Sequence, residues 1–381
     1  MTDLEHILPL WNELESSGAD YVLATVVAVE GSSYRRPGAR MLLAQDGRRA
    51  GTVSGGCLEA EVAKRAWWLT SEGLVVERYS TLDDDGDLPY GSGCGGVVYI
   101  LLERRQTASP LLRALKSAFD ARTPLSIAAL LEGPLIGMRA FASPSAGTDF
   151  DFGHTVQNGS AQSRLQELAE HALMLRRSME RNISLDGAPV RAWADYRAAR
   201  PGLWIFGAGD DTKPLLRIAR ELGWFVAVAD GRSHLATQSR FPAADLVCVL
   251  PGGDGARTEA LPVLSTDAAV LMTHSFEQDS HILASLLNDA GEFPFAYVGV
   301  LGPQRRTREA LVEAARLRHL ALDADQIDSW LAQLHAPTGI DLGADTPASI
   351  ALSILAEIQQ TINAATALPL RQVRAPKIEV G

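Results

Sequence analysis

The chain has 381 residues, of which 46% are hydrophobic and 21% are charged, a composition typical of a soluble globular protein with two or three domains. Its formal net charge of −11 argues against nucleic acid or an anionic membrane surface as the main partner. Three cysteines are too few for a disulfide framework, no apolar run approaches the about 20 residues that cross a bilayer, and the first residues lack a signal-peptide pattern. Together these features predict a cytoplasmic protein without a membrane partner.

The first hundred residues are typical of a mixed α+β domain. An amphipathic helix, interrupted by Pro9, comes before a valine-rich strand, and a hairpin, a second helix and two further strands follow. The expected ranges after the first helix are 21–30 for the strand, 39–53 for the hairpin, 58–69 for the helix, and 74–80 and 97–102 for the last two strands.

A polar loop over 31–38 separates the first strand from the hairpin. Its residues Ser32, Arg35 and Arg36 suit a phosphate or carboxylate, because the guanidinium group binds such anions bidentately. An ordinary solvated turn is the alternative interpretation.

Two of the three cysteines lie in glycine-rich stretches, Gly51-Thr-Val-Ser-Gly-Gly-Cys57-Leu-Glu59 and Gly91-Ser-Gly-Cys94-Gly-Gly96. Cys57 is expected at a helix N-terminus, where free N–H groups favour anions and lower the pKa of a thiol. Cys94 precedes an apolar strand. The alternative is that both are small buried apolar residues. Because there is no C-x-x-C spacing, a four-cysteine zinc site is not expected.

The signal is weak over 106–200, which we assign to the remainder of an N-terminal domain, 1–200, with a linker. A helix over 110–121, a strand over 125–131, a loop over 142–159 and a helix over 162–181 are expected there. His154 and His171 have no evident partners and are interpreted as structural.

From residue 201 the sequence alternates strands and helices, which predicts a Rossmann-like, doubly wound parallel sheet over 201–364. A strand runs into the turn Gly207-Ala-Gly209-Asp-Asp-Thr212, and a second strand ends at Asp230, where a ribose-binding carboxylate is expected. Thr212 replaces the third glycine of the dinucleotide pattern. The two aspartates of the turn would repel a phosphate unless a cation such as Lys213 compensates them.

The last part of this domain is a helix opened by Thr346 as N-cap and Pro347 as first residue. Glu357 within this helix is interpreted as a carboxylate on the solvated face. Cys248 lies in an apolar strand and is expected to serve packing, and residues 365–381 are expected to form a flexible tail.

Taken in order, these motifs resemble the XdhC/CoxI family. In the first half the resemblance is carried by Gly31-Ser-Ser-Tyr-Arg-Arg-Pro-Gly-Ala-Arg40, by the Cys57 motif and by Cys94-Gly-Gly96. The second half contributes the motifs Asp230-Gly-Arg232, Arg240-Phe-Pro242, Thr273-His-Ser275, Gly299-Val-Leu-Gly302 and His335-Ala-Pro337. One difference is that the family turn often reads Gly-Ala-Gly-His, whereas Asp210 follows Gly209 here.

The resemblance implies a maturation factor for molybdenum hydroxylases such as xanthine dehydrogenase. Such a factor binds the molybdenum cofactor (molybdopterin), holds it while a cysteine desulfurase supplies the terminal sulfido ligand, and inserts it into the apo-enzyme. It implies a cofactor-binding accessory protein rather than a turnover enzyme. A homodimer is expected, and a nucleotide in the Rossmann domain is a further candidate ligand.

The candidate site residues follow from the motifs and from this resemblance. Cys57 and Cys94 are the candidate ligands of the metal, because thiolates bind soft metals, and no catalytic acid or base is identified. The candidate cofactor-binding residues are Cys57, Cys94, Gly55, Gly56, Glu59, Ser32, Arg35, Arg36, Gly95, Gly207, Gly209, Asp230, Arg232 and His274. The competing hypotheses are an NAD(P)-dependent oxidoreductase with a reactive cysteine, and a protein-interaction scaffold.

Overall fold

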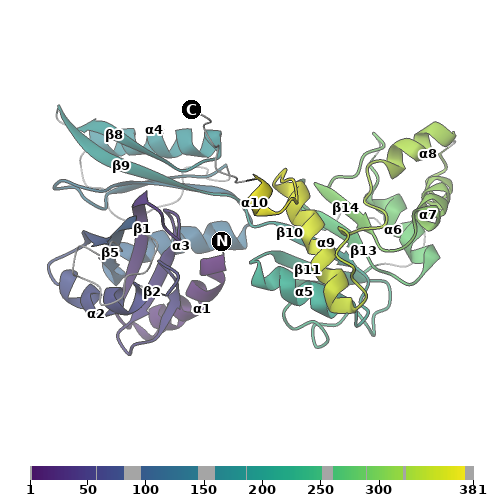
Figure 1. Cartoon of the computed structure of the whole chain (residues 1–381), viewed down its shortest axis with the longest axis horizontal. Helices are drawn as coiled ribbons and strands as arrows, with labels where there is room; N and C mark the ends of the chain where they lie inside the picture. The colour runs from purple at the N-terminus through teal and green to yellow at the C-terminus, as the bar shows by residue number, and fades with distance from the viewer. Residues whose placement is uncertain are drawn as a thin grey trace. The chain divides into compact units, whose positions relative to one another are not determined.

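The computed structural model describes residues 2–56, 58–80, 96–144, 159–185, 187–250, 261–288, 290–320 and 323–373. The chain divides into two compact units, Met1–Arg200 and Pro201–Gly381 (Figure 1). Within the described residues, no helix combines the length and apolar character that a membrane span requires.

The first unit contains a five-stranded antiparallel sheet in the order β3-β2-β1-β5-β4. Successive side chains of β1 point to opposite faces, so that Leu23 packs against α1 and α3 whereas Val22 and Ala24 pack against α2. The elements are α1 (Thr2–Ser17), β1 (Tyr21–Gly31), β2 (Arg40–Ala44), β3 (Arg49–Gly51), α2 (Glu59–Leu69), β4 (Val75–Ser80), β5 (Gly96–Arg104) and α3 (Arg105–Asp120).

A second antiparallel sheet, in the order β7-β6-β9-β8, completes the first unit, with α4 packed on one face. Its elements are β6 (Leu125–Leu130), β7 (Arg139–Ala142), α4 (Gly159–Leu175), β8 (Met179–Leu185) and β9 (Ala188–Arg197). The helix expected over 162–181 is therefore wrong at its end, because Arg176 takes a φ of 52° and the chain turns into β8. The segment after it is a β-hairpin rather than a linker.

Buried ion pairs connect the two sheets of this unit. Arg40 of β2 donates to Asp195 of β9 at 2.8 Å, and both side chains are nearly inaccessible to water. Burial lowers the pKa of Arg40 to about 10, although the charge of Asp195 opposes this shift. Arg139 and Glu103 form a second buried pair. These contacts fix the end of the polar loop, since Arg40 also donates to the carbonyl of Gly38.

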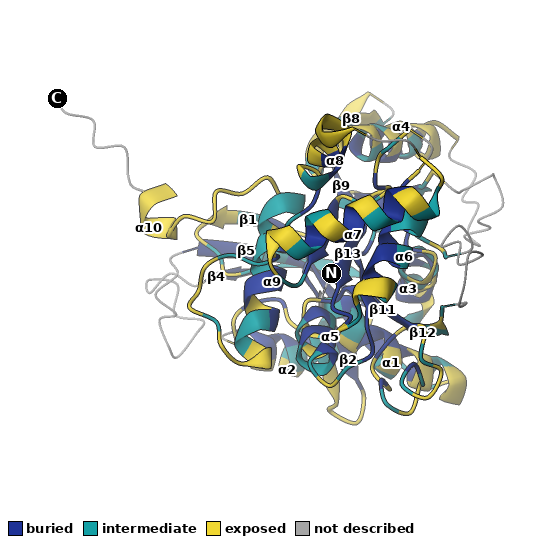
Figure 2. Ribbon diagram, turned by 90° about the vertical axis from the view of Figure 1, so that its right-hand side faces the viewer, coloured by how far each residue is buried: buried dark blue, intermediate teal, exposed yellow. Residues whose placement is uncertain are grey.

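The second unit is a parallel five-stranded sheet in the order β12-β11-β10-β13-β14, with helices on both faces, which confirms the predicted Rossmann-like architecture. Alternating residues of β10 separate the two cores: Ile205 faces α5 and α9, whereas Trp204 faces α6, α7 and α8. Figure 2 shows these helices with a buried and an exposed side. The elements are β10 (Gly202–Phe206), α5 (Thr212–Glu221), β11 (Phe225–Asp230), β12 (Leu246–Val249), β13 (Ala268–Leu271), α6 (Phe276–Leu286), β14 (Tyr297–Val300), α7 (Gln304–Leu317), α8 (Ala324–Leu331), α9 (Pro347–Ile362) and α10 (Leu370–Val373).

The start of α9 confirms the predicted cap. The side chain of Thr346 accepts a hydrogen bond from the backbone N–H of Ser349, and the side chain of Ser349 accepts one from the backbone N–H of Thr346. Pro347 is the first helical residue.

Candidate functional site

In the first unit, the polar loop lies beside Gly55 and beside Gly96, the described residue of the second glycine motif. Gly31, at the end of β1, pairs in register with Gly96, at the start of β5. A Cβ atom on Gly96 would overlap the carbonyl oxygen of Ser32, and one on Gly55 would lie 3.2 Å from the ring of Tyr34. Glycine therefore allows the backbone of Gly96 to approach that of Ser32, and it allows the ring of Tyr34 to lie close to Gly55.

Glu59 fixes the loop that leads into α2. Its buried carboxylate accepts hydrogen bonds from the N–H groups of Val53, at 3.2 Å, and Ser54, at 2.8 Å, and from the Ser54 hydroxyl at 2.5 Å. Ser54 Oγ in turn accepts from the N–H groups of Gly56 and Leu58. Burial alone would raise the pKa of Glu59, but these hydrogen bonds outweigh it and hold the pKa below its usual value. Glu59 is thus a carboxylate that shapes the loop.

The two candidate arginines of the polar loop differ in their surroundings. Arg35 forms an ion pair with Asp3 of α1. Arg36 is exposed, and its guanidinium has no hydrogen-bond or ion-pair partner among the described residues. Arg36 is therefore available to an anion, whereas Arg35 already anchors the loop to α1.

Cys57, Cys94 and Gly95, which the sequence placed at the centre of the site, lie outside the described residues. The helix that follows Cys57 in the sequence begins at Glu59, with Leu58 at the N-cap position. The third cysteine, Cys248, is half-buried in β12 of the second unit, and burial raises the pKa of its thiol. This setting agrees with the packing role predicted for Cys248.

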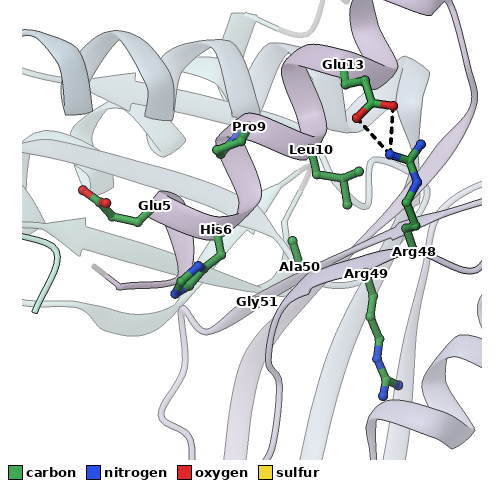
Figure 3. A pocket seen from close by; sticks show the side chains of 9 residues that line it. All are labelled: Glu5, His6, Pro9, Leu10, Glu13, Arg48, Arg49, Ala50 and Gly51. Atoms are coloured by element: carbon green, nitrogen blue, oxygen red, sulfur yellow. Dashed lines mark hydrogen bonds and ion pairs between the residues drawn. The ribbon is translucent and has the colours of Figure 1, made fainter. Parts of the chain in front are cut away.

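A cavity of about 750 Å³ lies between α1 and β3 (Figure 3). Arg48 reaches across to Glu13, with 2.8 Å between the guanidinium and the carboxylate, whereas the side chain of Arg49 points away from this pair. Gly51, the first residue of the Cys57 motif, forms part of the lining. Its φ of 79° and the proximity of the Arg40 carbonyl both require glycine.

In the second unit, the Gly207–Thr212 turn joins β10 to α5 at the carboxyl edge of the sheet, beside the end of β13. Gly207 takes a φ of 130°, and a Cβ there would be 2.9 Å from the carbonyl group of Met272. Thr212, which departs from the glycine pattern, is buried, and its hydroxyl donates to the carbonyl of Gly207 at 2.8 Å. The threonine therefore closes the turn from within.

Cations compensate the first aspartate of this turn. Asp210 Oδ1 lies 2.7 Å from Lys213 Nζ and 2.9 Å from a guanidinium nitrogen of Arg240. Asp211 Oδ2 lies 3.5 Å from Nε2 of the exposed His274, and Asp211 Oδ1 is buried without a hydrogen-bond partner among the described residues. Gly209, Asp211 and His274 are thus brought together at the end of β10 and β13.

The carboxylate of Asp230 is engaged within the protein. It accepts hydrogen bonds from the N–H of Ala208 at 2.7 Å, from the N–H of Arg232 at 2.8 Å, and from the Arg232 guanidinium at 2.7 and 2.9 Å. Burial would raise its pKa, but the bonds from Arg232 and Ala208 hold the pKa below its usual value. A ribose hydroxyl would have to compete with Arg232 for this carboxylate.

Glu357 was interpreted as solvated, and this interpretation is wrong. Its Oε2 accepts hydrogen bonds from the hydroxyl of Tyr297 and the N–H of Gly339, each at 2.6 Å, and its Oε1 lies 2.9 Å from His335 Nδ1. These hydrogen-bond partners belong to β14 and to the loop after α8. The sequence of α9 alone therefore could not indicate that Glu357 has partners. The candidate residues named from the sequence also do not include Tyr34 and Ser54, which contact the glycine loop and Glu59 in the structure.

Two family models match the chain: the XdhC Rossmann domain over residues 203–358, and the XdhC and CoxI family over residues 14–80. The chain is 29% identical over 352 residues to a Bacillus subtilis protein described as a probable xanthine dehydrogenase subunit, covering 89% of this chain and 92% of that protein. It is 33% identical over 134 residues to the molybdenum cofactor insertion chaperone PaoD of Escherichia coli, covering 33% of this chain and 39% of PaoD.

A crystal structure described as a xanthine dehydrogenase from Bacillus halodurans is similar to the structure of this chain, with a TM-score of 0.67 and 26% sequence identity. The similarity covers 98% of this chain and 100% of the other. Matched family models in both units, and a relative aligned over most of the chain, show that the protein belongs to the XdhC and CoxI family.

Proposed function

We propose that the protein binds the molybdenum cofactor as cargo, holds it while a cysteine desulfurase supplies the terminal sulfido ligand, and inserts it into a xanthine dehydrogenase-type molybdenum hydroxylase. The names of the Bacillus subtilis relative and of PaoD support a role in the maturation of such an enzyme.

The observation that carries the proposal is the convergence of the polar loop, the Gly55–Gly56 loop and Gly96. A pterin dithiolene with a phosphate needs a cation, close approach of the backbone and a soft ligand for the metal. Among the described residues, Arg36 supplies an unpaired cation, and a Cβ on Gly56 would meet no atom of them within 4 Å, so these residues leave the loop open on that side. In the sequence, Cys57 and Cys94 stand directly beside these segments, and we propose that they supply the thiolates.

The Rossmann unit supports a nucleotide less well. Asp230 is bonded to Arg232, and Asp211 occupies the space beside Gly209. The second unit therefore supports a hydride-transferring dehydrogenase less well than the first unit supports a cofactor carrier.

The test is the molybdenum and pterin content of protein purified from a cofactor-producing host. Wild type, Cys57→Ala and Cys94→Ala would be compared with Cys248→Ala, a matched cysteine control in a strand of the other unit. We expect stoichiometric cofactor in wild type and Cys248→Ala, and a clear loss in at least one of the other variants. Wild-type protein that retains NAD(P) and no molybdenum would overturn the proposal.

The later steps need a separate assay. Cofactor-loaded protein would be mixed with apo-hydroxylase, with and without a cysteine desulfurase and cysteine, and hydroxylase activity would be followed. We expect activation only when the desulfurase has acted on the loaded protein. We also propose a homodimer, which light scattering would test.

A further inference from the structure

We infer that Tyr34 is a stacking surface for the flat heteroaromatic ring of the cargo and that Arg36, rather than Arg35, binds its phosphate. The inference rests on the proposed function, and it concerns residues of the polar loop that the structure describes. Tyr34 was not among the residues selected from the sequence.

The ring of Tyr34 lies beside Gly55 and is otherwise largely exposed. A Cβ on Gly55 would lie 3.2 Å from two atoms of its ring and 3.6 Å from a third, so that the ring lies directly against the glycine backbone. The side chain is nevertheless 76% exposed, the highest value among the exposed large apolar residues of the described chain. One part of the ring therefore contacts the loop while the remainder is accessible to a ligand.

The backbone around the ring also leaves room. Gly56 takes a φ of 111°, and a Cβ there would meet no atom of the described residues within 4 Å. Ser54 and Glu59 fix this glycine loop by the hydrogen bonds described above. The exposed ring consequently lies beside a backbone that hydrogen bonds fix and that no described residue covers at Gly56, which are the properties of a preformed contact surface.

Of the two arginines after Tyr34, Arg35 has a structural role and Arg36 is the one that can bind a ligand. Arg35 is paired with Asp3, which ties the loop to α1. Arg36 is exposed without a partner among the described residues, and it lies two positions from the ring in the sequence. An aromatic ring and an unpaired guanidinium in one short loop match a ligand that has a planar heterocycle and an anionic group.

The chemistry favours a pterin over an aliphatic anion at this place. A flat heterocycle can stack its π-face on an aromatic side chain. Where proteins bind nucleobases in this way, the stacking contributes a substantial part of the binding affinity. The phosphate of the cargo then accounts for Arg36 through charge-assisted hydrogen bonds. A simple phosphate site would have no use for the exposed ring.

The experiment measures two quantities: pterin and molybdenum retained on purification, and the affinity for 6-carboxypterin, a stable fluorescent pterin with an anionic group, by fluorescence quenching. The variants are Tyr34→Ala, Tyr34→Phe, Arg36→Gln and Arg35→Gln. Trp68→Ala, which removes an aromatic side chain that is 71% exposed in the last turn of α2, is the matched control. Circular dichroism would verify that each variant is folded.

Tyr34→Ala and Arg36→Gln are each expected to weaken binding of 6-carboxypterin by about tenfold or more, with a parallel loss of retained cofactor. Tyr34→Phe keeps the ring, so this variant and Trp68→Ala are expected to stay within about twofold of wild type. Arg35→Gln should affect binding less than Arg36→Gln, because Arg35 is engaged with Asp3.

Failure of the proposed function and failure of this inference give different results. Wild-type protein that neither retains cofactor nor binds 6-carboxypterin would refute the proposed function itself. Wild-type binding that Tyr34→Ala leaves unchanged would refute the stacking role alone. If Tyr34→Ala bound both ligands normally but no longer transferred cofactor to the apo-hydroxylase, Tyr34 would be a protein contact and the inference would be wrong.

Discussion

Replacement of Glu59 by glutamine should loosen the loop before α2 without unfolding the protein. The residue is 5% exposed, and its carboxylate accepts three hydrogen bonds from Val53 and Ser54. Glutamine keeps one carbonyl acceptor, but it loses the negative charge and turns an N–H₂ donor towards the Ser54 hydroxyl. Since hydrogen bonds to a charged group contribute about 1.5–3 kcal/mol, we expect a local loss of about 2 kcal/mol.

Hydrogen exchange followed by mass spectrometry measures this loss where it occurs. A loss of about 2 kcal/mol corresponds to exchange about thirtyfold faster in peptides that cover residues 53–62, with no change in peptides from β10. Glu61→Gln is the matched control on the same helix, because among the described residues the one ion pair of Glu61 is a partly exposed contact with Arg65 at 3.9 Å. Equal exchange rates in the two variants would refute the bracing role of Glu59.

The same carboxylate predicts a pH dependence. The pKa of Glu59 is lower in the folded protein than its ordinary value of 4.5, because hydrogen bonds to Ser54 and Val53 outweigh burial. Its stabilising contribution is therefore complete above about pH 4.5 and is lost as the pH falls through the lower, folded value. The difference in urea stability between wild type and Glu59→Gln should be constant from neutral pH to about pH 5 and should shrink below that. A difference that grows on acidification would contradict the assignment.

Three further substitutions test other parts of the structure. Asp195→Ala leaves Arg40 buried without its ion-pair partner and should destabilise the first unit by about 3–5 kcal/mol in urea unfolding. Asp46→Ala removes an exposed carboxylate and should leave the urea midpoint nearly unchanged. Gly96→Ala should separate the start of β5 from Ser32 and reduce cofactor content several-fold. The control is Gly159→Ala at the start of α4, where the φ is not in the left-handed region and an added Cβ would meet no atom of the described residues within 4 Å. Unchanged content in Gly96→Ala would argue against the converging loops as the site. Glu357→Gln removes the charged acceptor of two hydrogen bonds, one from the hydroxyl of Tyr297 and one from the N–H of Gly339. It should therefore lower the melting temperature of the second unit by several degrees in calorimetry at neutral pH. An unchanged transition would show that this network adds no stability.

Much of the second unit could be predicted from the sequence. The strand before Gly207, the acid at the end of the next strand and the alternation of strands and helices are all local patterns, and the parallel sheet confirms them. The cap of α9 was predictable for the same reason, since Thr346 and Pro347 act on the turn next to them.

The first unit was less predictable beyond its first sheet. The helix expected over 162–181 ends early, and the polar residues of β8 gave little sign of a strand. An exposed strand lacks a continuous apolar pattern, because its place depends on pairing with β9 rather than on burial of its own side chains.

The sequence by itself determined the family, the two kinds of α/β architecture and the short segments that carry the candidate site. Glycine spacing, hydrophobic period and capping residues act over a few neighbouring positions, so they can be recognised without coordinates. Only the tertiary structure decided which charges are paired within the protein: Asp3 engages Arg35, and Asp230 is bonded to Arg232. Arg36 is exposed and has no such partner among the described residues. The contact of Tyr34 with Gly55 is of the same kind. The physical reason is that a side chain's availability depends on atoms that folding brings to it from other parts of the chain, and sequence spacing does not encode those distances.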